Sequence, residues 1–116
     1  MREALIRILG SEYEVMSAED GLAGLEIARK VRPDLIVTEL LLPGMDGFQL
    51  LRRLKEERET RDIPVVVFSV LLAADRCRRM GADAFVEKPH HQDVLLPTVR
   101  NLLEKRHRGA RDVEGT

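Results

Sequence analysis

The sequence contains very few aromatic residues and a single cysteine. Aromatic side chains make up 3% of the 116 residues, with no tryptophan and one tyrosine, Tyr13. Such a chain lacks the row of rings on which bases of single-stranded nucleic acid stack. One cysteine excludes an intrachain disulfide and a zinc site built from cysteines. Cys77 lies between Arg76 and Arg78. One interpretation is that these positive charges lower the pKa of the thiol and make it reactive. We favour the alternative of an inert, half-buried helix thiol.

Long apolar runs and an excess of charge of one sign are also lacking. The formal net charge is −1, so no global field would draw the protein to nucleic acid or to an anionic membrane. No apolar stretch near the N-terminus is long enough for a signal peptide or a membrane span. We therefore expect a cytoplasmic protein with neither a nucleic-acid nor a membrane partner. A chain of 116 residues forms one domain with a proper core and is too short for two.

Apolar residues follow strand-like and helical patterns in alternation. Short apolar runs predict strands at 13–16, 35–37, 65–68 and 84–86, and helical periodicity predicts helices at 3–10, 17–30, from 46, at 71–80 and around 97–103. The runs 35–37 and 65–68 are continuous, which is typical of strands covered by helices on both faces. The pattern predicts an α/β fold with a parallel sheet. We expect one domain over residues 1–105 and a polar, disordered tail over 106–116.

Capping residues mark two of the helix starts. Ser17 followed by Asp20 is a capping-box pattern for the helix 17–30, whose inward face would hold Leu22, Leu25 and Ala28. Asp46 with Gln49 is the same pattern for the next helix, whose inward side chains would be Leu50, Leu51 and Leu54. Near the C-terminus, Pro97 either kinks the last helix or marks its first turn.

The segment 38–47, TELLLPGMDG, follows one strand and precedes a helix. It resembles the phosphorylation-site segment of two-component response regulator receiver domains, the CheY-like family. In that family an aspartate four residues before the proline accepts a phosphoryl group, and here that position is Glu39. The resemblance assigns Ser69 and Lys88 to the residues that contact the phosphoryl group, and Phe85 to the switch aromatic. It covers about residues 3 to 105.

The resemblance implies a flavodoxin-like, doubly wound parallel sheet. Receivers open with a buried strand that ends in two acidic residues, whereas the first element here, residues 3–10, matches the helix that follows it. We therefore expect that the sequence begins about ten residues too late for a complete receiver. The gap would be closed either by direct pairing of 13–16 with 35–39 or by a strand from another copy. Because exposed strand edges invite association, we expect a dimer or higher assembly.

Loss of the two acids bears on the cofactor that the resemblance implies. Receivers hold Mg²⁺ with those acids and the acceptor aspartate, and only the acceptor position remains here. Asp20, Asp34 and Asp46 belong to other elements, and we expect no metal centre. The Glu39 carboxylate reaches about an ångström further than an aspartate. It either imitates the phosphorylated state or forms a partly buried ion pair with Lys88, and we favour the ion pair.

Other departures from the receiver pattern lie near the C-terminal half. Only eleven residues separate Ser69 from Gly81, so the loop that moves when receivers switch is trimmed. His90 and His91 are adjacent, diverge in direction and lack a third ligand, which indicates ordinary loop residues. Basic side chains form either a solvated surface or a docking face; they are Arg76, Arg78, Arg79, Lys105, Arg106, Arg108 and Arg111.

Three functional hypotheses follow. The first is a stand-alone, degenerate receiver that binds a signalling protein, either a histidine kinase or a downstream effector, without phosphoryl chemistry. The second is a phosphoacceptor receiver whose first strand and acidic pair are missing from this sequence. The third is a structural or dimerisation element with a receiver-like fold. An enzyme is the least expected class, because no nucleophile–base pair or glycine-rich phosphate loop is present.

Overall fold

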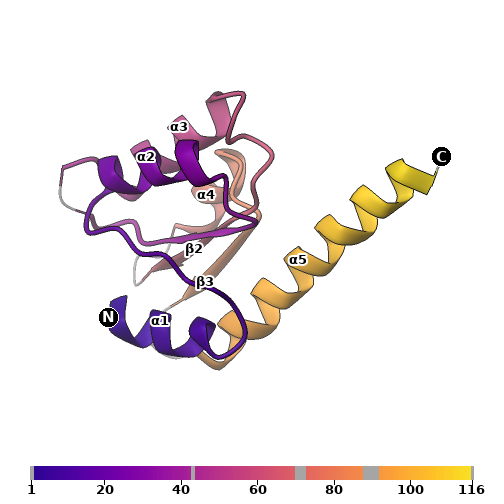
Figure 1. Ribbon diagram of the computed structural model, residues 1–116. Helices are drawn as coiled ribbons and strands as arrows, with labels where there is room; N and C mark the ends of the chain where they lie inside the picture. The colour runs from indigo at the N-terminus through magenta and orange to yellow at the C-terminus, as the bar shows by residue number, and fades with distance from the viewer. Residues whose placement is uncertain (1, 43, 70–72, 88–91, 116) are drawn as a thin grey trace.

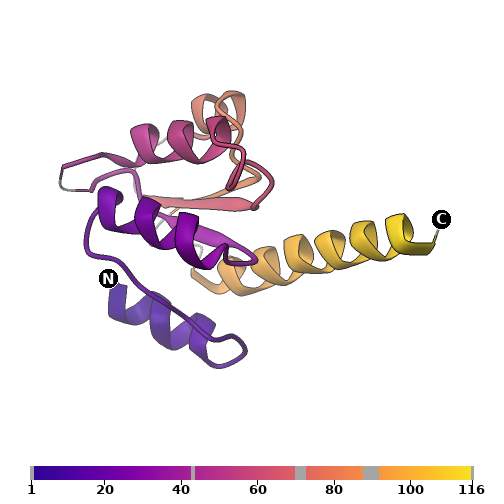
Figure 2. The ribbon, with the colours of Figure 1, turned by 45° about the horizontal axis from the view of Figure 1, so that its top comes forward.

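The chain folds into alternating helices and parallel strands (Figure 1). The computed structural model describes residues 2–42, 44–69, 73–87 and 92–115. Its elements are α1 (Arg2–Gly10), α2 (Gly21–Val31), β1 (Ile36–Thr38), α3 (Gly47–Glu56), β2 (Val65–Ser69), α4 (Ala74–Arg79), β3 (Ala84–Glu87) and α5 (Gln92–Gly115). Figures 1 and 2 show α2 and α3 on one side of the sheet and α1 and α5 on the other.

The sheet has the order β1-β2-β3, and both pairings are parallel. All five residues of the central strand β2 are buried. Because side chains alternate along a strand, Val65 and Val67 pack with α2 and α3, whereas Val66 and Phe68 pack with α1 and α5. The predicted flavodoxin-like α/β class is confirmed, and the continuous apolar run of β2 is explained by helices on both faces.

Helix α3 begins as the sequence predicts. The Gln49 backbone N–H donates to Asp46 Oδ1 at 2.9 Å, and the Asp46 N–H donates to Gln49 Oε1 at 3.0 Å, which completes a capping box. The predicted inward face is also confirmed, because Leu50, Leu51 and Leu54 are all buried. The amino-acid pattern alone was enough here, since a cap and an apolar stripe are both local features.

Helix α2 begins later than predicted. Its N-cap is Asp20, whose carboxylate accepts a hydrogen bond from the Ala23 N–H at 2.8 Å. Leu25 and Ala28 are buried as expected, but Leu22 lies in the first turn and is 52% exposed. The helix ends at Val31, and the C-cap residue Arg32 takes the left-handed conformation with φ of 51°, directly before Pro33.

The predicted strand at 13–16 does not form. Tyr13 donates its N–H to Leu9 O at 2.9 Å, and no residue of this stretch pairs with β1 in the part of the chain that the structure describes. Tyr13 and Val15 are instead half-buried against the apolar cluster under α1 and α5. The alternation therefore reflects packing alone, because a strand needs a hydrogen-bonded neighbour. Direct pairing with 35–39, one of the two expected ways to close the gap, is excluded.

Helix α5 continues past the predicted end of the domain. It runs to Gly115 and contains Pro97 in its interior, so the interpretation of Pro97 as a first-turn residue is wrong. Arg106 extends from α5 toward the sheet and contacts the chain there. The predicted disorder of residues 106–116 stays a prediction.

No helix among the described residues is both long and apolar enough to cross a membrane.

Candidate functional site

The carboxyl ends of the three strands lie side by side, and two of the four predicted site residues, Glu39 and Ser69, are found there. Glu39 directly follows β1, and Ser69 is the last residue of β2. The register pairs Ser69 with Glu87, the last residue of β3. Carboxyl ends of parallel strands are where open α/β sheets build their sites. The topology thus brings Glu39 and Ser69 to the same edge, as the sequence predicts.

The backbone at Glu39 is held by the start of α3. The Gly47 N–H donates to Leu40 O at 2.9 Å, and a Cβ on Gly47 would lie 2.0 Å from Glu39 O and 2.5 Å from Leu40 Cα. On the other side, the Thr38 hydroxyl donates to Glu39 O at 3.0 Å. Leu40 is buried in the cluster between α2 and α3. Glu39 therefore lies at the end of β1, and its backbone is tightly packed on both sides.

Ser69 and Phe85 occupy different environments. Ser69 is only 2% exposed, whereas Phe85 is half-buried on β3 opposite Val67. Phe85 lines a cavity of about 730 Å³ between β3, α4 and α5, together with Arg79 and Val94. The predicted switch aromatic thus borders a cavity at the surface formed by the last two helices.

Lys88, His90 and His91 lie outside the described residues. The ion pair between Glu39 and Lys88 therefore stays a prediction, as does the assignment of Lys88 to phosphoryl contact. The short connection after Ser69 also includes residues 70–72, which are outside the described part of the chain.

The described residues do not fit the Mg²⁺ that the receiver resemblance implies. Mg²⁺ needs several oxygen ligands in near-octahedral geometry. Asp20 and Asp46 are engaged as helix caps, and Asp34 lies before β1, at the other end of the strand. Across the described ranges, no three His, Cys, Asp or Glu side chains form a group that could hold a metal ion. Glu39 is the single carboxylate at the acceptor position, and we derive no step through a metal.

Cys77 and Arg76 have structural roles within α4. Cys77 is fully buried, and burial raises the pKa of its thiol, with the charge of Arg76 acting in the opposite direction. The alternative of a reactive thiol is therefore not supported. The Arg76 guanidinium lies 3.8 Å from the centre of the Phe48 ring, a cation–π contact that joins α4 to α3.

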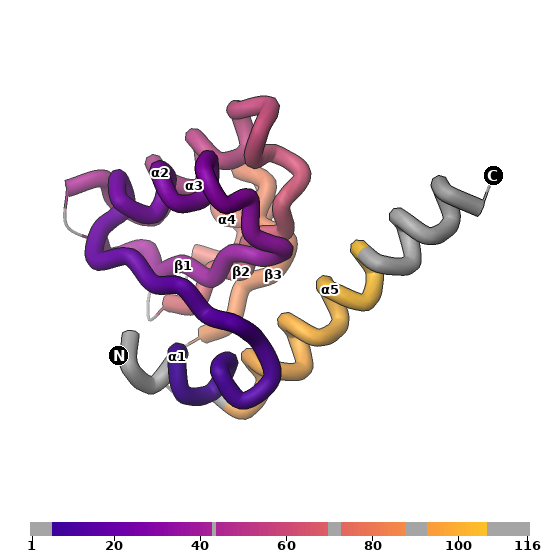
Figure 3. The backbone as a smooth tube through the Cα atoms, viewed as in Figure 1, coloured from indigo at the N-terminus to yellow at the C-terminus, as the bar shows by residue number. Residues whose placement is uncertain are grey.

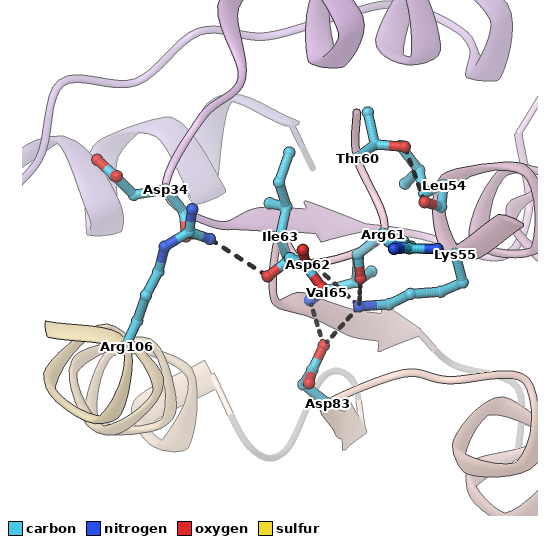
Figure 4. Close-up of polar contacts among 10 residues, drawn as sticks. All are labelled: Asp34, Leu54, Lys55, Thr60, Arg61, Asp62, Ile63, Val65, Asp83 and Arg106. Carbon is cyan, nitrogen blue, oxygen red and sulfur yellow. Dashed lines mark hydrogen bonds and ion pairs between the residues drawn. The ribbon is translucent and has the colours of Figure 1, made fainter. Parts of the chain in front are cut away.

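At the other end of the strands, where β2 and β3 begin, lies a polar network that the sequence did not reveal (Figure 4). Lys55 Nζ donates to Ile63 O at 2.9 Å and lies 3.0 Å from Asp83 Oδ2, which also accepts from the Val65 N–H at 2.8 Å. Arg106 donates to Asp34 O at 3.3 Å and Asp62 O at 3.4 Å. Lys55 thus joins α3 to the starts of β2 and β3. No local signal separates Lys55 from an ordinary solvated helix lysine.

Comparisons with known proteins agree with this geometry. The family model for the response regulator receiver domain matches residues 1–100. The response regulator PleD of Caulobacter vibrioides is 39% identical over 108 residues, which cover 86% of this chain and 24% of PleD. The polar-differentiation response regulator DivK of Brucella anthropi is 33% identical over 99 residues, covering 83% of this chain and 80% of DivK.

A solved structure gives the same result. The receiver domain of a signal transduction histidine kinase from Syntrophus aciditrophicus superposes with a TM-score of 0.78 at 34% identity, covering 90% of this chain and 82% of that one. The chain spans about a quarter of PleD, so the likeness to PleD concerns its matching part alone. From its parallel sheet, its strand-end residues and these matches, the chain belongs to the response regulator receiver domain family.

Proposed function

We propose that this receiver domain is degenerate and acts in two-component signalling as a protein-interaction module that does not depend on phosphorylation. In this role it has no catalytic activity of its own and works in the cytoplasm. The observation that carries the proposal is the glutamate at the acceptor position, at a strand edge where the described residues offer no three-carboxylate group. Glu39 departs from the family's aspartate at the one residue that would form the bond to phosphorus, and its longer side chain displaces the carboxylate, which favours loss of the chemistry.

The chemistry can be tested directly. The protein is incubated with Mg²⁺ and acetyl phosphate, and its intact mass is measured. We expect no phosphoryl adduct on the wild-type chain. An adduct would overturn the proposal and favour the second hypothesis, a phosphoacceptor.

A matched variant separates the effect of residue 39 from the effect of lacking a metal site. Glu39→Asp restores the family's acceptor residue and leaves Asp20 and Asp46 engaged as helix caps. We expect no adduct on this variant either, because one carboxylate does not make an octahedral oxygen site. An adduct on Glu39→Asp would show that residue 39 alone blocks the reaction and would contradict the proposed loss of the metal site.

The partner in this proposal is a histidine kinase or a downstream effector. The face formed by α4, β3 and α5 supports it, since Phe85, Arg79 and the 42%-exposed Val94 border the cavity there. Binding to the cytoplasmic parts of the histidine kinases and to the effectors of the source cell is measured by biolayer interferometry without phosphate donors. We expect Val94→Lys to weaken the interaction about tenfold or more, since it charges an apolar contact. Leu22→Lys, on α2 and away from this cavity, should leave it unchanged.

The charge of Glu39 provides a further test of the same partner complex. If the carboxylate imitates a phosphoryl group, Glu39→Gln weakens binding; if it is structural, binding is unchanged. We favour unchanged binding, because one negative charge is less than the roughly 1.5 to 2 charges of a phosphoryl group.

A further inference from the structure

The strand β3 forms one edge of the sheet. The sheet order is β1-β2-β3, so β3 has a strand neighbour on one side alone among the described residues (Figure 3). Val65 of β2 turns its backbone toward β3, since its C=O accepts the Asp83 N–H at 2.9 Å and its N–H donates to Asp83 Oδ2 at 2.8 Å. Because backbone groups alternate in direction along a strand, Val67 also turns its N–H and C=O toward β3.

The register then determines which backbone groups of β3 face outward. Val67 lies opposite Phe85, and in a parallel ladder a residue bonds to the two neighbours of the residue that it faces. Val67 therefore bonds to Ala84 and Val86, and the backbone N–H and C=O of Phe85 point away from β2. Those of Glu87, two residues further on, point the same way. Outward-facing backbone groups along a sheet edge are a template for an added strand.

The cavity of about 730 Å³ between β3, α4 and α5 lies along this edge. All four residues of β3 line it, and α4 and α5 form its two walls. Ala73 and Phe85 are on the α4 side, where both pack against the apolar cluster of α2 and α3. Val94 and Val86 are on the α5 side, where Val86 belongs to the cluster under α1 and α5. A strand in this cavity would therefore meet apolar side chains on both of its faces.

The charged residues of the cavity are sorted by sign along β3. Helix α4 begins after the carboxyl end of β2 and ends before the amino end of β3, so it runs antiparallel to the strands. Asp75, in the first turn of α4, therefore lies toward the carboxyl end of β3 with Glu87, whereas Arg79 lies toward the amino end. Arg76, between them, is engaged with the Phe48 ring. An added strand would complement these charges if it is basic at the first end and acidic at the second.

We propose that the cavity binds an extended segment of the partner protein, which adds to β3 as an antiparallel edge strand. The segment is about five residues long, the usual length of a strand. It begins with lysine or arginine beside Asp75 and Glu87, continues with apolar residues, and ends with aspartate or glutamate beside Arg79. An antiparallel ladder is slightly more stable per residue, and many parallel sheets carry an antiparallel strand at one edge. This inference rests on the interaction role proposed above and names the chemistry by which the same face recognises its partner.

A second copy of this chain is a poorer occupant. Helices α4 and α5 both line the cavity, so they extend past β3 on the two faces of the sheet. Two copies that approached edge to edge would bring these helices into contact before their strands reached the spacing of about 4.8 Å that pairing needs. A single extended segment carries no helices on its faces and fits between the two walls.

The test uses the capped peptide Lys-Val-Ile-Val-Glu, titrated into the full ¹⁵N-labelled chain and followed by NMR. The control peptide, Glu-Val-Ile-Val-Lys, has the same composition but would place like charges side by side in antiparallel addition. A third peptide carries an N-methyl group on the isoleucine, which removes a backbone donor in mid-strand. We expect the first peptide to shift the amide signals of Phe85 and Glu87, and the other two to bind at least about tenfold more weakly.

Two protein variants locate the site. Arg79→Glu reverses the charge at the amino end of the cavity, and Arg7→Glu makes the same change on α1, outside the cavity; both arginines are exposed. We expect Arg79→Glu to weaken binding of the first peptide about tenfold and Arg7→Glu to change it less than about twofold. Equal effects of the two variants, equal binding of the three peptides, or no binding of the first peptide would overturn the proposal.

Hydrogen exchange distinguishes strand addition from other contacts on the same face. The Phe85 amide should become protected when the peptide binds, while the Ile36 amide, already bonded to Pro64 O, serves as the internal reference. Unchanged exchange at Phe85 with bound peptide would overturn strand addition. A protein that is dimeric without peptide, with the Phe85 amide already protected, would place a second copy in the cavity and would likewise overturn the proposal.

Failure of strand addition can be told apart from failure of the proposed function. A partner that binds, loses affinity with Val94→Lys and leaves the Phe85 amide unprotected would overturn strand addition, while the interaction role would stand. A phosphoryl adduct on the wild-type chain would overturn the proposed function, and the peptide measurements would still decide whether a strand adds to β3.

Discussion

Gly47 lies against the backbone of Glu39 so closely that a Cβ at residue 47 would come within 2.0 Å of Glu39 O. The start of α3 and the end of β1 therefore require a glycine at this position for steric reasons. The contact also fixes the backbone that carries the Glu39 carboxylate. The first turn of α3 is therefore in direct contact with the backbone of the acceptor position.

Replacement of Gly47 tests this contact. Gly47→Ala should lower the free energy of unfolding by about 2 kcal/mol, since the clash is with backbone atoms that cannot move aside cheaply. Urea denaturation measures the change. Gly24→Ala in α2 is the matched control, because its Cβ would meet Ala18 at 3.8 Å, an ordinary contact. That control should gain about 0.5 to 1 kcal/mol from helix propensity. A Gly47→Ala protein as stable as the wild type would contradict the steric argument.

The polar network of Lys55 and Asp83, at the starts of β2 and β3, should contribute measurably to stability. Lys55→Met removes the donor to Ile63 O and the partner of Asp83, and we expect a loss of about 1 to 2 kcal/mol in urea denaturation. Arg52→Met is the control on the same helix. Arg52 pairs with Glu56 at 3.4 Å but is 72% exposed, so its loss should cost less than about 0.5 kcal/mol. Similar losses in both variants would mean that the network has no special role.

The ion pair between Arg29 and Glu57 should make stability depend on pH. Arg29 donates two hydrogen bonds, at 2.7 and 2.6 Å, which hold the pKa of Glu57 below its usual value of 4.5. A lowered carboxyl pKa stabilises the folded state above 4.5, and this contribution disappears as the pH falls through the lowered value. The difference in melting temperature between wild type and Arg29→Met should therefore be present at neutral pH and vanish in acid.

The neighbouring Lys30 provides the control for that experiment. It is exposed, and Lys30→Met removes the same charge without removing the hydrogen bonds to Glu57. Its melting temperature should follow that of the wild type across the same pH range. A pH-dependent difference for Lys30→Met as large as that for Arg29→Met would point to net charge as the cause.

Cys77 should resist alkylation in the folded protein. It is fully buried, and burial raises the pKa of its thiol, so both access and thiolate are limited. Iodoacetamide at about pH 8, followed by intact mass, should modify the native chain about a hundredfold more slowly than the chain in denaturant. Rapid modification of the native protein would show that α4 opens readily or that the thiol is reactive.

Local features of the sequence predicted much of the fold. The cap of α3 at Asp46 and its buried leucines follow from spacing within one helix. The continuous apolar run 65–68 identified the central strand, because a strand covered on both faces has no polar face to alternate with. The positions of Glu39 and Ser69 at one edge followed from the ends of these strands. Each of these inferences uses residues that are close together in the chain.

Segment 13–16 shows where such reasoning fails. Its residues have the composition and alternation of a strand, yet strand formation depends on a neighbouring backbone and not on composition alone. In the structure, the alternating apolar residues Tyr13 and Val15 pack under the sheet without forming a strand. No pattern within four residues distinguishes these two outcomes.

The sequence by itself determined the family, the caps and the covered strands, together with the glutamate at the acceptor position. Only the tertiary structure decided that Lys55 joins α3 to β2 and β3, that Cys77 is buried, and that a cavity lies along the open edge of β3. The physical reason is separation along the chain. Helix caps and apolar periods are set by neighbours within a few residues, whereas a buried thiol, a shared carboxylate and an open strand edge depend on segments that only folding brings together.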